Sequence, residues 1–506
     1  MGSRWRLPAL DSGVIVEAIA LGIALAISVA ITRWVLVLTD EAWFLQVVRR
    51  VRDGERLYED VFFGAGPLAV WLAGLAVRWS RPQITVIRAL TIGYGFAIWF
   101  AGIALLRLVG LDRIYSVVFV LGALALGGHH LARGNQYGLL SQLGVIIAAL
   151  GVIQGDGLLT GTGIALALTG KYSLGVFATL WALPLLAIEA GFAAAVWAAL
   201  VIAAAGVAIG LILGTRGVRS FVAVAVANKG TYLATAGIGP VQDLLDRVRR
   251  TGRTPLYRAI TLVGPIAVFT VFALGAAAAP LGLIAGVLEG SSLLVLASAI
   301  CATGLTVAFP RADHGHQIAA MPIVLLGMLP IIAWITPPIA VLAGVAVVLG
   351  GVLATTLAAS VLVVRSAMVR RDLPRLRLLP VMMQGLVWPD DTESVVRTAG
   401  NEVFVLRPDA PYFYLSGRLE NPTPYDYPLA TTFGPHGQAT IVAAINTGRV
   451  RWVCYPGPFG GRLAPTQLEE FMVHRTPVTP TALGGLYDSE TDLTGAGVHR
   501  DSRPSR

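Results

Sequence analysis

Long apolar runs separated by short polar segments dominate the chain as far as Val364. Many of these runs approach or exceed the roughly 18–20 residues that a helix needs to cross a bilayer. Membrane β-barrel strands show a different pattern, in which apolar and polar residues alternate over about ten positions. The sequence therefore predicts a polytopic α-helical membrane protein with about eleven to thirteen transmembrane helices. The predicted spans are 14–38, 67–79, 84–106, 114–128, 138–153, 157–170, 173–190, 192–213, 260–288, 291–309, 316–336 and 338–364.

The composition supports this interpretation and excludes several classes of soluble protein. Charged residues make up only 13% of the 506 residues, whereas soluble proteins average about 25%. Cys301 lies in an apolar run and Cys454 in the polar tail, so no disulfide framework is predicted. The net charge of +9 comes mostly from basic residues beside apolar runs. Because such residues set orientation and contact anionic headgroups, we expect membrane lipids as partners and no nucleic acid.

The pattern divides the chain into three parts. Residues 1–370 form the predicted transmembrane domain, in which residues 39–66 are the first large loop. The residues before the first span are basic, so the positive-inside rule puts the N-terminus in the cytoplasm and this loop on the outer face. Residues 380–480 have the strand–helix–strand pattern of a small soluble α/β domain. Residues 481–506 are polar and are predicted to be a disordered tail.

The first outer loop begins with an acidic pair, Asp40 and Glu41, directly after the first span. Apolar residues from Phe44 to Val51 recur on one helical face, which predicts an amphipathic helix on the membrane surface that ends before Gly54. Two acids in a first turn suit a helix N-terminus, because the helix dipole favours negative charge there. The functional alternative is a carboxylate pair that takes a proton from a sugar hydroxyl.

The order of motifs in this loop resembles a known superfamily. An acidic pair after the first span is followed by an amphipathic helix ending in Asp53–Gly54, a Tyr58–Asp60 segment and the Gly66–Leu68 segment that opens the next span. This order is similar to that of the GT-C membrane glycosyltransferases, and more narrowly to their protein O-mannosyltransferase and aminoarabinose-transferase branch, including its bacterial members. The segment 412–427 also resembles the C-terminal segment of such enzymes.

The resemblance implies a GT-C-like fold and a specific role for the acidic pair. In that superfamily the Asp of the first outer loop is the catalytic base or the acid that positions the acceptor. Residue for residue, this role falls on Asp40, with Glu41 as its neighbour.

Charged residues beside later apolar runs are candidate ligands for a lipid phosphate, because charge at bilayer depth is costly. Arg311, Asp313 and His316 stand at the start of a late span. The guanidinium of Arg311 can bind two phosphate oxygens at once, and the Arg-x-Asp-x-x-His pattern resembles the lipid-phosphate site of bacterial members of the family. A metal site and a structural loop are the alternatives. Lys171 lies between two apolar runs, where it either flanks a span or pairs with the phosphate, and the resemblance favours the phosphate.

A second polar stretch separates two earlier spans. Its residues His129, His130, Arg133 and Gln136, together with Tyr58 of the outer loop, are predicted to line a substrate cavity. Adjacent histidines diverge on a helix and no carboxylate accompanies them, so we predict no metal site in this stretch. An ordinary loop is the alternative.

These features predict an enzyme of the cell envelope. We expect it to transfer a hexosyl or pentosyl group from a polyprenyl-phosphate sugar to a glycan, lipid or protein acceptor, on the extracytoplasmic side of the cell membrane. The residue bias suggests a GC-rich bacterial genome. The sequence lacks a clear Asp-x-Asp pair for a metal-bound nucleotide sugar, which fits a lipid-phosphate donor, and dependence on a divalent metal stays open.

Two other functions compete with this prediction. A secondary transporter or lipid flippase is the main alternative, although such proteins often have repeated halves and no repeat is evident here. A scaffold protein is the other. The number of transmembrane spans is a point of conflict. The family topology puts the C-terminal tail on the same side as Asp40, which requires an odd number of spans, whereas the hydrophobic pattern of this sequence gives about twelve. The arginines in 365–377 also suggest a cytoplasmic segment.

Overall fold

The computed structural model describes residues 12–34, 38–77, 84–131, 135–250, 255–308, 311–336, 389–415, 419–458, 464–481 and 483–490. The chain divides into two compact units, each built from segments that are distant in the sequence. The first, here called the helical unit, comprises Met1–Leu36, Arg88–Gly206 and Ile238–Arg371. The second, the mixed unit, comprises Val37–Ile87, Val207–Gly237 and Asp372–Arg506.

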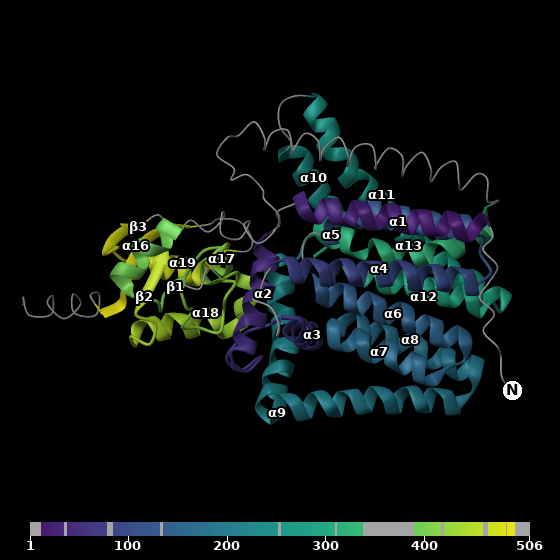
Figure 1. Ribbon diagram of the computed structural model, residues 1–506, viewed down its shortest axis with the longest axis horizontal. Coiled ribbons are helices and arrows are strands. Elements are labelled where there is room, and N and C mark those ends of the chain that lie inside the picture. The colour runs from purple at the N-terminus through teal and green to yellow at the C-terminus, as the bar shows by residue number, and fades with distance from the viewer. Residues whose placement is uncertain are drawn as a thin grey trace, which may run out of the picture. The chain divides into compact units, whose positions relative to one another are not determined.

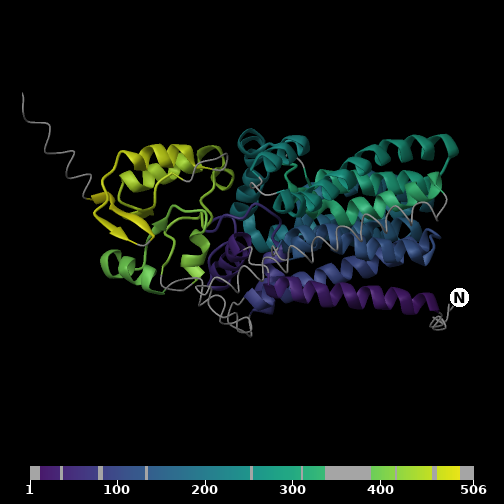
Figure 2. The ribbon, with the colours of Figure 1, turned by 90° about the horizontal axis from the view of Figure 1, so that it is seen from above.

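The helical unit is a bundle of helices that lie side by side, as Figures 1 and 2 show, and all of them except the short polar helix α10 (Pro240–Arg250) are apolar. The long helix α9 is interrupted at Gly214 and passes into the mixed unit at Val207. The helices of the bundle are α1 (Ser12–Trp34), α4 (Ile84–Leu108), α5 (Arg113–Leu131), α6 (Gln136–Gln154), α7 (Gly157–Gly170), α8 (Tyr172–Ala190), α9 (Phe192–Ala236), α10 (Pro240–Arg250), α11 (Pro255–Glu289), α12 (Ser292–Thr306) and α13 (His314–Ile335).

Close contacts at glycines fix the direction of several helices. Gly13 at the start of α1 lies against the side chain of Arg113 at the start of α5, so these two helices run parallel. Gly127 near the end of α5 lies against the backbone of Ile318 near the start of α13. The ends of α1 and α5 and the start of α13 are therefore at the same end of the bundle, which we call the α13 end.

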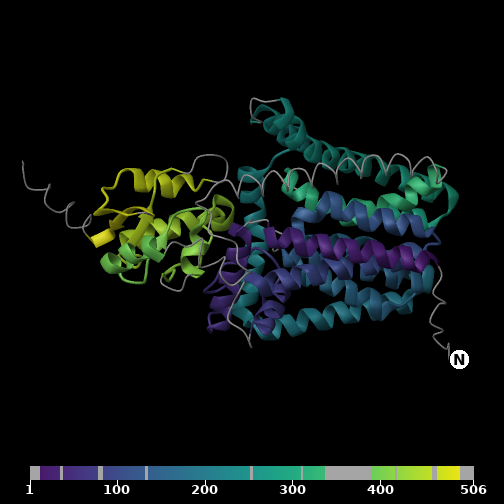
Figure 3. The same ribbon diagram turned by 45° about the horizontal axis from the view of Figure 1, so that its top comes forward.

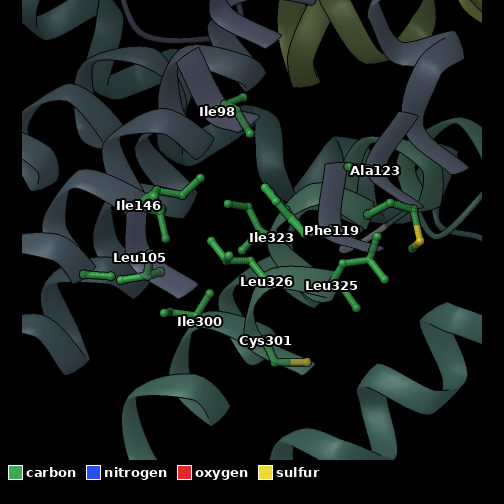
Figure 4. Close-up of a cluster of buried hydrophobic side chains, with 14 of the residues drawn as sticks. Ile98, Leu105, Phe119, Ala123, Ile146, Ile300, Cys301, Ile323, Leu325 and Leu326 are labelled. Carbon is green, nitrogen blue, oxygen red and sulfur yellow. The ribbon is translucent and has the colours of Figure 1, made fainter. Parts of the chain in front are cut away.

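The core of the bundle is made of tightly packed aliphatic side chains. Lipid tails are as apolar as leucine, so helices in a membrane associate through close packing rather than through the hydrophobic effect. Gly144 of α6 and Gly163 of α7 show how close the backbones come, since a Cβ atom at Gly144 would lie 2.6 Å from the carbonyl oxygen of Gly163. Figure 4 shows part of this core, including Ile98, Leu105, Phe119, Ala123, Ile146, Ile300, Cys301, Ile323, Leu325 and Leu326.

The helical unit confirms the predicted polytopic helical fold. Among the described residues, six helices are long and apolar enough to cross a membrane, and four shorter apolar helices accompany them. The most apolar windows of α6 and α13 are 72% and 78% buried inside the protein, whereas that of α9 is 6% buried. Helices α6 and α13 are therefore central, and α9 has the exposure expected of a lipid-facing helix.

Two of the predicted spans need comment. The span predicted at 67–79 corresponds to α3 (Leu68–Ala76), which has nine residues. At about 1.5 Å per residue it is less than half as long as the hydrocarbon core of a bilayer is thick, so it does not cross the membrane. The span predicted at 338–364 and the arginines in 365–377 lie outside the described residues.

The mixed unit contains a small sheet with helices on both faces. The order of its strands is β1-β2-β4-β3; β1 pairs with β2 in parallel and the other pairs are antiparallel. Figure 3 shows the strands among their helices. The elements are α2 (Leu38–Arg52), α3, α16 (Pro389–Ala399), β1 (Phe404–Val405), α17 (Ala410–Leu415), α18 (Ala430–Asn446), β2 (Trp452–Tyr455), α19 (Thr466–Val473), β3 (Thr479–Thr481) and β4 (Gly484–Asp488).

Alternate residues of the strands face two separate cores, as the two-residue period of a strand requires. Phe404 and Val453 belong to a core that includes residues of α18 and α19. Val405 and Cys454 belong to the other core, which includes residues of α16 and α17. Burial on both faces produces the C-terminal α/β architecture that the sequence predicts.

The first outer loop belongs to this same unit. Ala42 of α2 is completely buried in the core that contains Val405. The ring of Trp43 lies 5.7 Å from that of Tyr427, and the amide of Phe62 donates to the carbonyl of Pro424 at 2.9 Å. The helix that carries the acidic pair is thus packed against the C-terminal residues, which the sequence places more than 300 positions away.

Candidate functional site

The N-terminus of α13 carries three of the predicted site residues in direct contact. Asp313 is the N-cap residue of α13, and its Oδ1 accepts hydrogen bonds from the His316 amide at 3.0 Å and from His316 Nδ1 at 2.8 Å. Its Oδ2 pairs with Nε of Arg311 at 2.5 Å. The two oxygens of one carboxylate therefore hold an arginine and a histidine beside the start of an apolar helix.

The electrostatics of this cluster favour the ionised carboxylate. Burial alone would raise the pKa of Asp313, but the hydrogen bond from His316 and the charges of His316 and Arg311 hold it well below its usual range. The side chain of Arg311 is 28% exposed and that of His316 is 31% exposed. Both are accessible enough to meet a ligand while they stay fixed by Asp313.

Contacts with α10 and the preceding segment hold the start of α13 in place. The amide of His314 donates to Oδ2 of Asp243 at 2.9 Å, and the amide of Ala312 donates to the carbonyl of Ile238 at 2.9 Å. The first amides of a helix lack partners within the helix, and the acids Asp243 and Asp313 occupy two of these positions. An anion suits this position because of the positive end of the helix dipole.

Lys171 lies at the same end of the bundle. It is the single residue between α7 and α8, and its Nζ lies 3.4 Å from the carbonyl oxygen of Val307, just after α12. Gly170 before it lies against the backbone of Tyr137 in the first turn of α6. Lys171, between α7 and α8, thus contacts the start of the segment that connects α12 to α13. Arg311 lies in that same segment, 140 positions after Lys171 in the sequence.

Three of the predicted cavity residues lie beside the connection between α5 and α6. Gln136 is the first residue of α6 and is completely buried. His129 and His130 lie in the last turns of α5, and Arg133 is outside the described residues. His129, His130 and Gln136 lie at the α13 end of the bundle, and the role of these residues as cavity lining stays a prediction.

The acidic pair forms the first turn of α2 in the mixed unit. Asp40 is half-buried, and Glu41 is completely buried. The last turn of the same helix carries Arg49, Arg50 and Arg52. Acids at the start and bases at the end both match the helix dipole, so the structural role of the pair is real and does not conflict with a catalytic one.

Arg50 is a residue that the sequence reasoning missed. Its guanidinium bonds the Glu55 carboxylate at 2.5–2.9 Å and the Asp426 carboxylate at 3.1 Å, and it donates to the carbonyls of Asp60 and Thr423. Each guanidinium nitrogen of Arg50 therefore donates at least one hydrogen bond. Arg50 therefore ties α2 both to the loop that follows it and to the C-terminal segment.

No local signal in the sequence identifies this pair. Arg50 follows Arg49 on a polar helix face, and Asp426 stands in an aromatic segment near the far end of the chain. Burial raises the pKa of Asp426, and the charge of Arg50 and hydrogen bonds from Asn421, Arg50 and Gln46 oppose that shift. Such a buried carboxylate needs Arg50 to remain charged.

Tyr58 has an unusual backbone conformation. Its φ of 71° lies in the left-handed region, which bulky residues rarely adopt. Its hydroxyl donates to the carbonyl of Ala65 at 2.5 Å, and its ring lies 5.0 Å from that of Phe221. These two contacts hold the turn between α2 and α3 in a single shape.

The described part of the chain contains no group of three or more His, Cys, Asp or Glu side chains that could hold a metal ion. The alternative of a metal at Arg311–His316 stays a prediction. The described cluster offers a cation, Arg311, that Asp313 holds beside a helix N-terminus.

Comparisons with known proteins add a structural resemblance. No protein-family model matches the chain, and no curated protein sequence matches it. Among solved structures, the chain is similar to that titled "Crystal Structure of ArnT from Cupriavidus metallidurans bound to Undecaprenyl phosphate", with 12% identity and a TM-score of 0.46. The alignment covers 91% of this chain and 85% of that one.

Proposed function

We propose that this chain is a GT-C-like membrane glycosyltransferase that uses a polyprenyl-phosphate sugar as its donor. The observation that carries the proposal is the N-terminus of α13, where Asp313 holds Arg311 and His316 at the boundary of a long apolar helix. A guanidinium beside a helix N-terminus suits a phosphate group. At the end of a membrane-spanning helix, the phosphate to expect is that of a lipid. The motif order of the first outer loop, which resembles that of the superfamily, supplies the reaction class.

The proposed reaction gives a separate role to each cluster. Asp40 accepts the proton of the acceptor hydroxyl while the oxygen of that hydroxyl forms a bond to the anomeric carbon of the sugar. The bond between that carbon and the phosphate oxygen breaks, and the electron pair leaves with the phosphate. Arg311, assisted by Lys171 and His316, stabilises the negative charge that develops on the leaving group. One carboxylate is sufficient as base for such a displacement, so Glu41 has a supporting role.

We infer that the transfer takes place on the extracytoplasmic face. The residues before α1 are basic, which favours a cytoplasmic N-terminus. Helix α1 ends at the α13 end of the bundle, and Asp40 follows its last residue, Trp34, by six positions. The expected acceptor is a glycan, lipid or protein outside the cytoplasm, and the transferred group is a hexose or a pentose.

The test is transfer in membrane vesicles supplied with polyprenyl phosphates that carry radiolabelled hexoses or pentoses. Asp40→Asn should abolish transfer to the acceptor while the protein remains folded and present at wild-type amounts. Asp112→Asn is the matched control, because Asp112 is an exposed acid next to the start of α5, at the other end of the bundle, and it should transfer normally. An Asp40→Asn variant with full activity would exclude the assignment. Sugar-lipid movement across the vesicle without any glycosylated product would indicate a flippase instead.

A further inference from the structure

A cavity of about 520 Å³ lies in the mixed unit beside the interruption in α9. Its size is within the roughly 300–1,000 Å³ that small-molecule sites occupy, and it is far larger than the space that one water fills. Three segments form its walls: the end of α2 with the loop that follows, α3 through Trp71, and the residues on both sides of Gly214. The lining residues are Val51, Glu55, Arg56, Leu57, Glu59, Trp71, Leu211, Ile212, Leu213, Gly214, Thr215 and Arg216.

The interruption in α9 gives this cavity polar backbone groups as well as side chains. Gly214 has φ 68° and ψ 173°, a conformation that only glycine adopts without strain and that the helical hydrogen-bond ladder cannot cross. Carbonyls before the interruption and amides after it are released from their helical partners. The residues that carry these groups, 211–216, are the same residues that line the cavity.

The opposite wall is held rigidly in place. The carboxylate of Glu55 is fixed by the buried Arg50 at 2.5–2.9 Å. Between the lining residues Leu57 and Glu59, Tyr58 keeps its left-handed backbone through the bond to Ala65. The cavity is therefore pre-formed on this side, which reduces the entropy that a ligand must lose on binding.

The charges and the aromatic ring of the lining indicate the class of ligand. The lining carries two carboxylates, Glu55 and Glu59, and two guanidinium groups, Arg56 and Arg216, so it has no formal net charge. Glu55 is paired with Arg50, and Glu59 with Arg56 at 3.3 Å. Both acceptors and donors are available, which suits hydroxyl groups that can do both. The indole of Trp71 adds a flat apolar surface, onto which the C–H face of a sugar ring fits. An acyl chain fits less well beside Glu59 and Arg216, since it offers no hydrogen bonds to these two charged groups.

We propose that this cavity binds an uncharged sugar, with Trp71 against the ring face and Glu59 and Arg216 as hydrogen-bonding partners. Sugar binding by this cavity does not depend on the proposed function, whereas the assignment of the cavity as the acceptor subsite rests on it. If the cavity is the acceptor subsite, the acceptor of this enzyme is a glycan.

The test measures binding without turnover. The full chain in lipid nanodiscs, which avoids detergents with sugar headgroups, is mixed with the methyl glycosides of glucose, galactose, mannose and arabinose. Saturation-transfer NMR then reports which of them bind. We expect a signal from at least one glycoside with the wild type. The signal should decrease at least fivefold in Trp71→Ala and in Arg216→Ala; Arg216 is exposed, so its loss leaves folding intact. Trp197→Ala is the matched control, since it removes another tryptophan, 58% exposed and outside the cavity.

Each outcome bears on the proposal. No signal from any glycoside with the wild type, or equal signals from wild type, Trp71→Ala and Arg216→Ala, would overturn it. Displacement of the signal by a short-chain phospholipid but not by excess glycoside would make the cavity a lipid site and overturn it as well. Asp40→Asn separates the two proposals, because it should bind the glycoside like the wild type. If Asp40→Asn also transfers normally, the proposed function fails while the sugar site stands.

Discussion

Arg50 and Asp426 form a buried ion pair at 3.1 Å that joins residues 376 positions apart. The side chain of Asp426 is completely buried and that of Arg50 is 9% exposed. Through this pair, the helix that begins with Asp40 and Glu41 is held on the C-terminal part of the mixed unit. The position of the acidic pair within this unit therefore depends on a domain that the sequence presents as separate.

Breaking this pair should be costly. Arg50→Met leaves the Asp426 carboxylate buried without its cation, and we expect a loss of about 3–5 kcal/mol of stability. The control is Arg52→Met, which breaks the more exposed pair with Asp53 and should cost no more than about 1 kcal/mol. Denaturation followed by tryptophan fluorescence in nanodiscs would measure both. If the two variants lose the same stability, the pair does not hold the unit together.

The cap of α13 and its charge can be separated by two substitutions. Asp313→Ala removes the cap and should cost about 1 kcal/mol. Asp313→Asn keeps a capping oxygen but removes the charge that pairs with Arg311. We expect it to remain folded while binding a polyprenyl-phosphate donor at least tenfold more weakly, because Arg311 loses its fixed position. Donor titration of both variants measures this, and unchanged affinity in Asp313→Asn would separate Arg311 from phosphate binding.

The lowered pKa of Asp313 also predicts a pH dependence. A carboxyl whose pKa is lower in the folded state stabilises the fold above its unfolded pKa of about 3.9, and this contribution is lost as pH falls toward the folded value. The unfolding temperature of the wild type should therefore decrease below about pH 4. Asp313→Asn cannot ionise at this position, so its unfolding temperature should decrease less over the same range. Parallel curves would contradict the contribution of Asp313.

Lys171 offers a test of the donor site on a second element. Lys171→Met removes the ammonium group while keeping most of the apolar stem, so we expect a donor KM raised about tenfold, which corresponds to about 1.4 kcal/mol. Lys171→Arg should retain much of the affinity because the charge remains. A Lys171→Met enzyme with an unchanged KM and unchanged kcat would show that the residue only flanks the span.

The glycine contact between α6 and α7 should tolerate no side chain. A Cβ atom at Gly144 would lie 2.5 Å from the Ala167 amide nitrogen, and backbone cannot move aside as a flexible side chain does. Gly144→Ala should therefore lower the unfolding temperature by several degrees. Gly93 in α4 has open space around it, so Gly93→Ala should be neutral or stabilising by up to about 1 kcal/mol. Equal effects of the two substitutions would contradict the close packing.

Local patterns predicted the parts of the fold that depend on local physics. Apolar runs marked the helices of the bundle, and short apolar segments around Val405 and Cys454 marked two strands. The sequence also predicts a helix from His436 to Thr447, after the Gly434–Pro435 step, which favours a turn. In the structure α18 includes that step and begins at Ala430. The apolar run of α3 was long enough to suggest a span until the helix proved to have nine residues.

In the candidate site, too, contacts between residues close in sequence could be predicted and contacts between distant residues could not. Arg311, Asp313 and His316 are close in sequence, so their contact could be anticipated from the spacing of a capped helix. Arg50 and Asp426 could not be paired from the sequence, because only the tertiary fold brings them together. The cavity beside Gly214 was equally hidden, since its walls come from three segments and the residue that opens it is one of 57 glycines.

The separation between Arg50 and Asp426 also sets the order of events during synthesis. At roughly 5–20 residues per second, the ribosome needs about 20–75 s to reach Asp426 after it has made Arg50. During that interval α2 exists without the core that later buries Ala42, and Arg50 has only its local partners. We therefore expect α2 to lie at the membrane surface during this interval, where anionic headgroups can bind the basic residues of its last turn. A chain interrupted before residue 426 would have most of its bundle and yet no fixed place for Asp40.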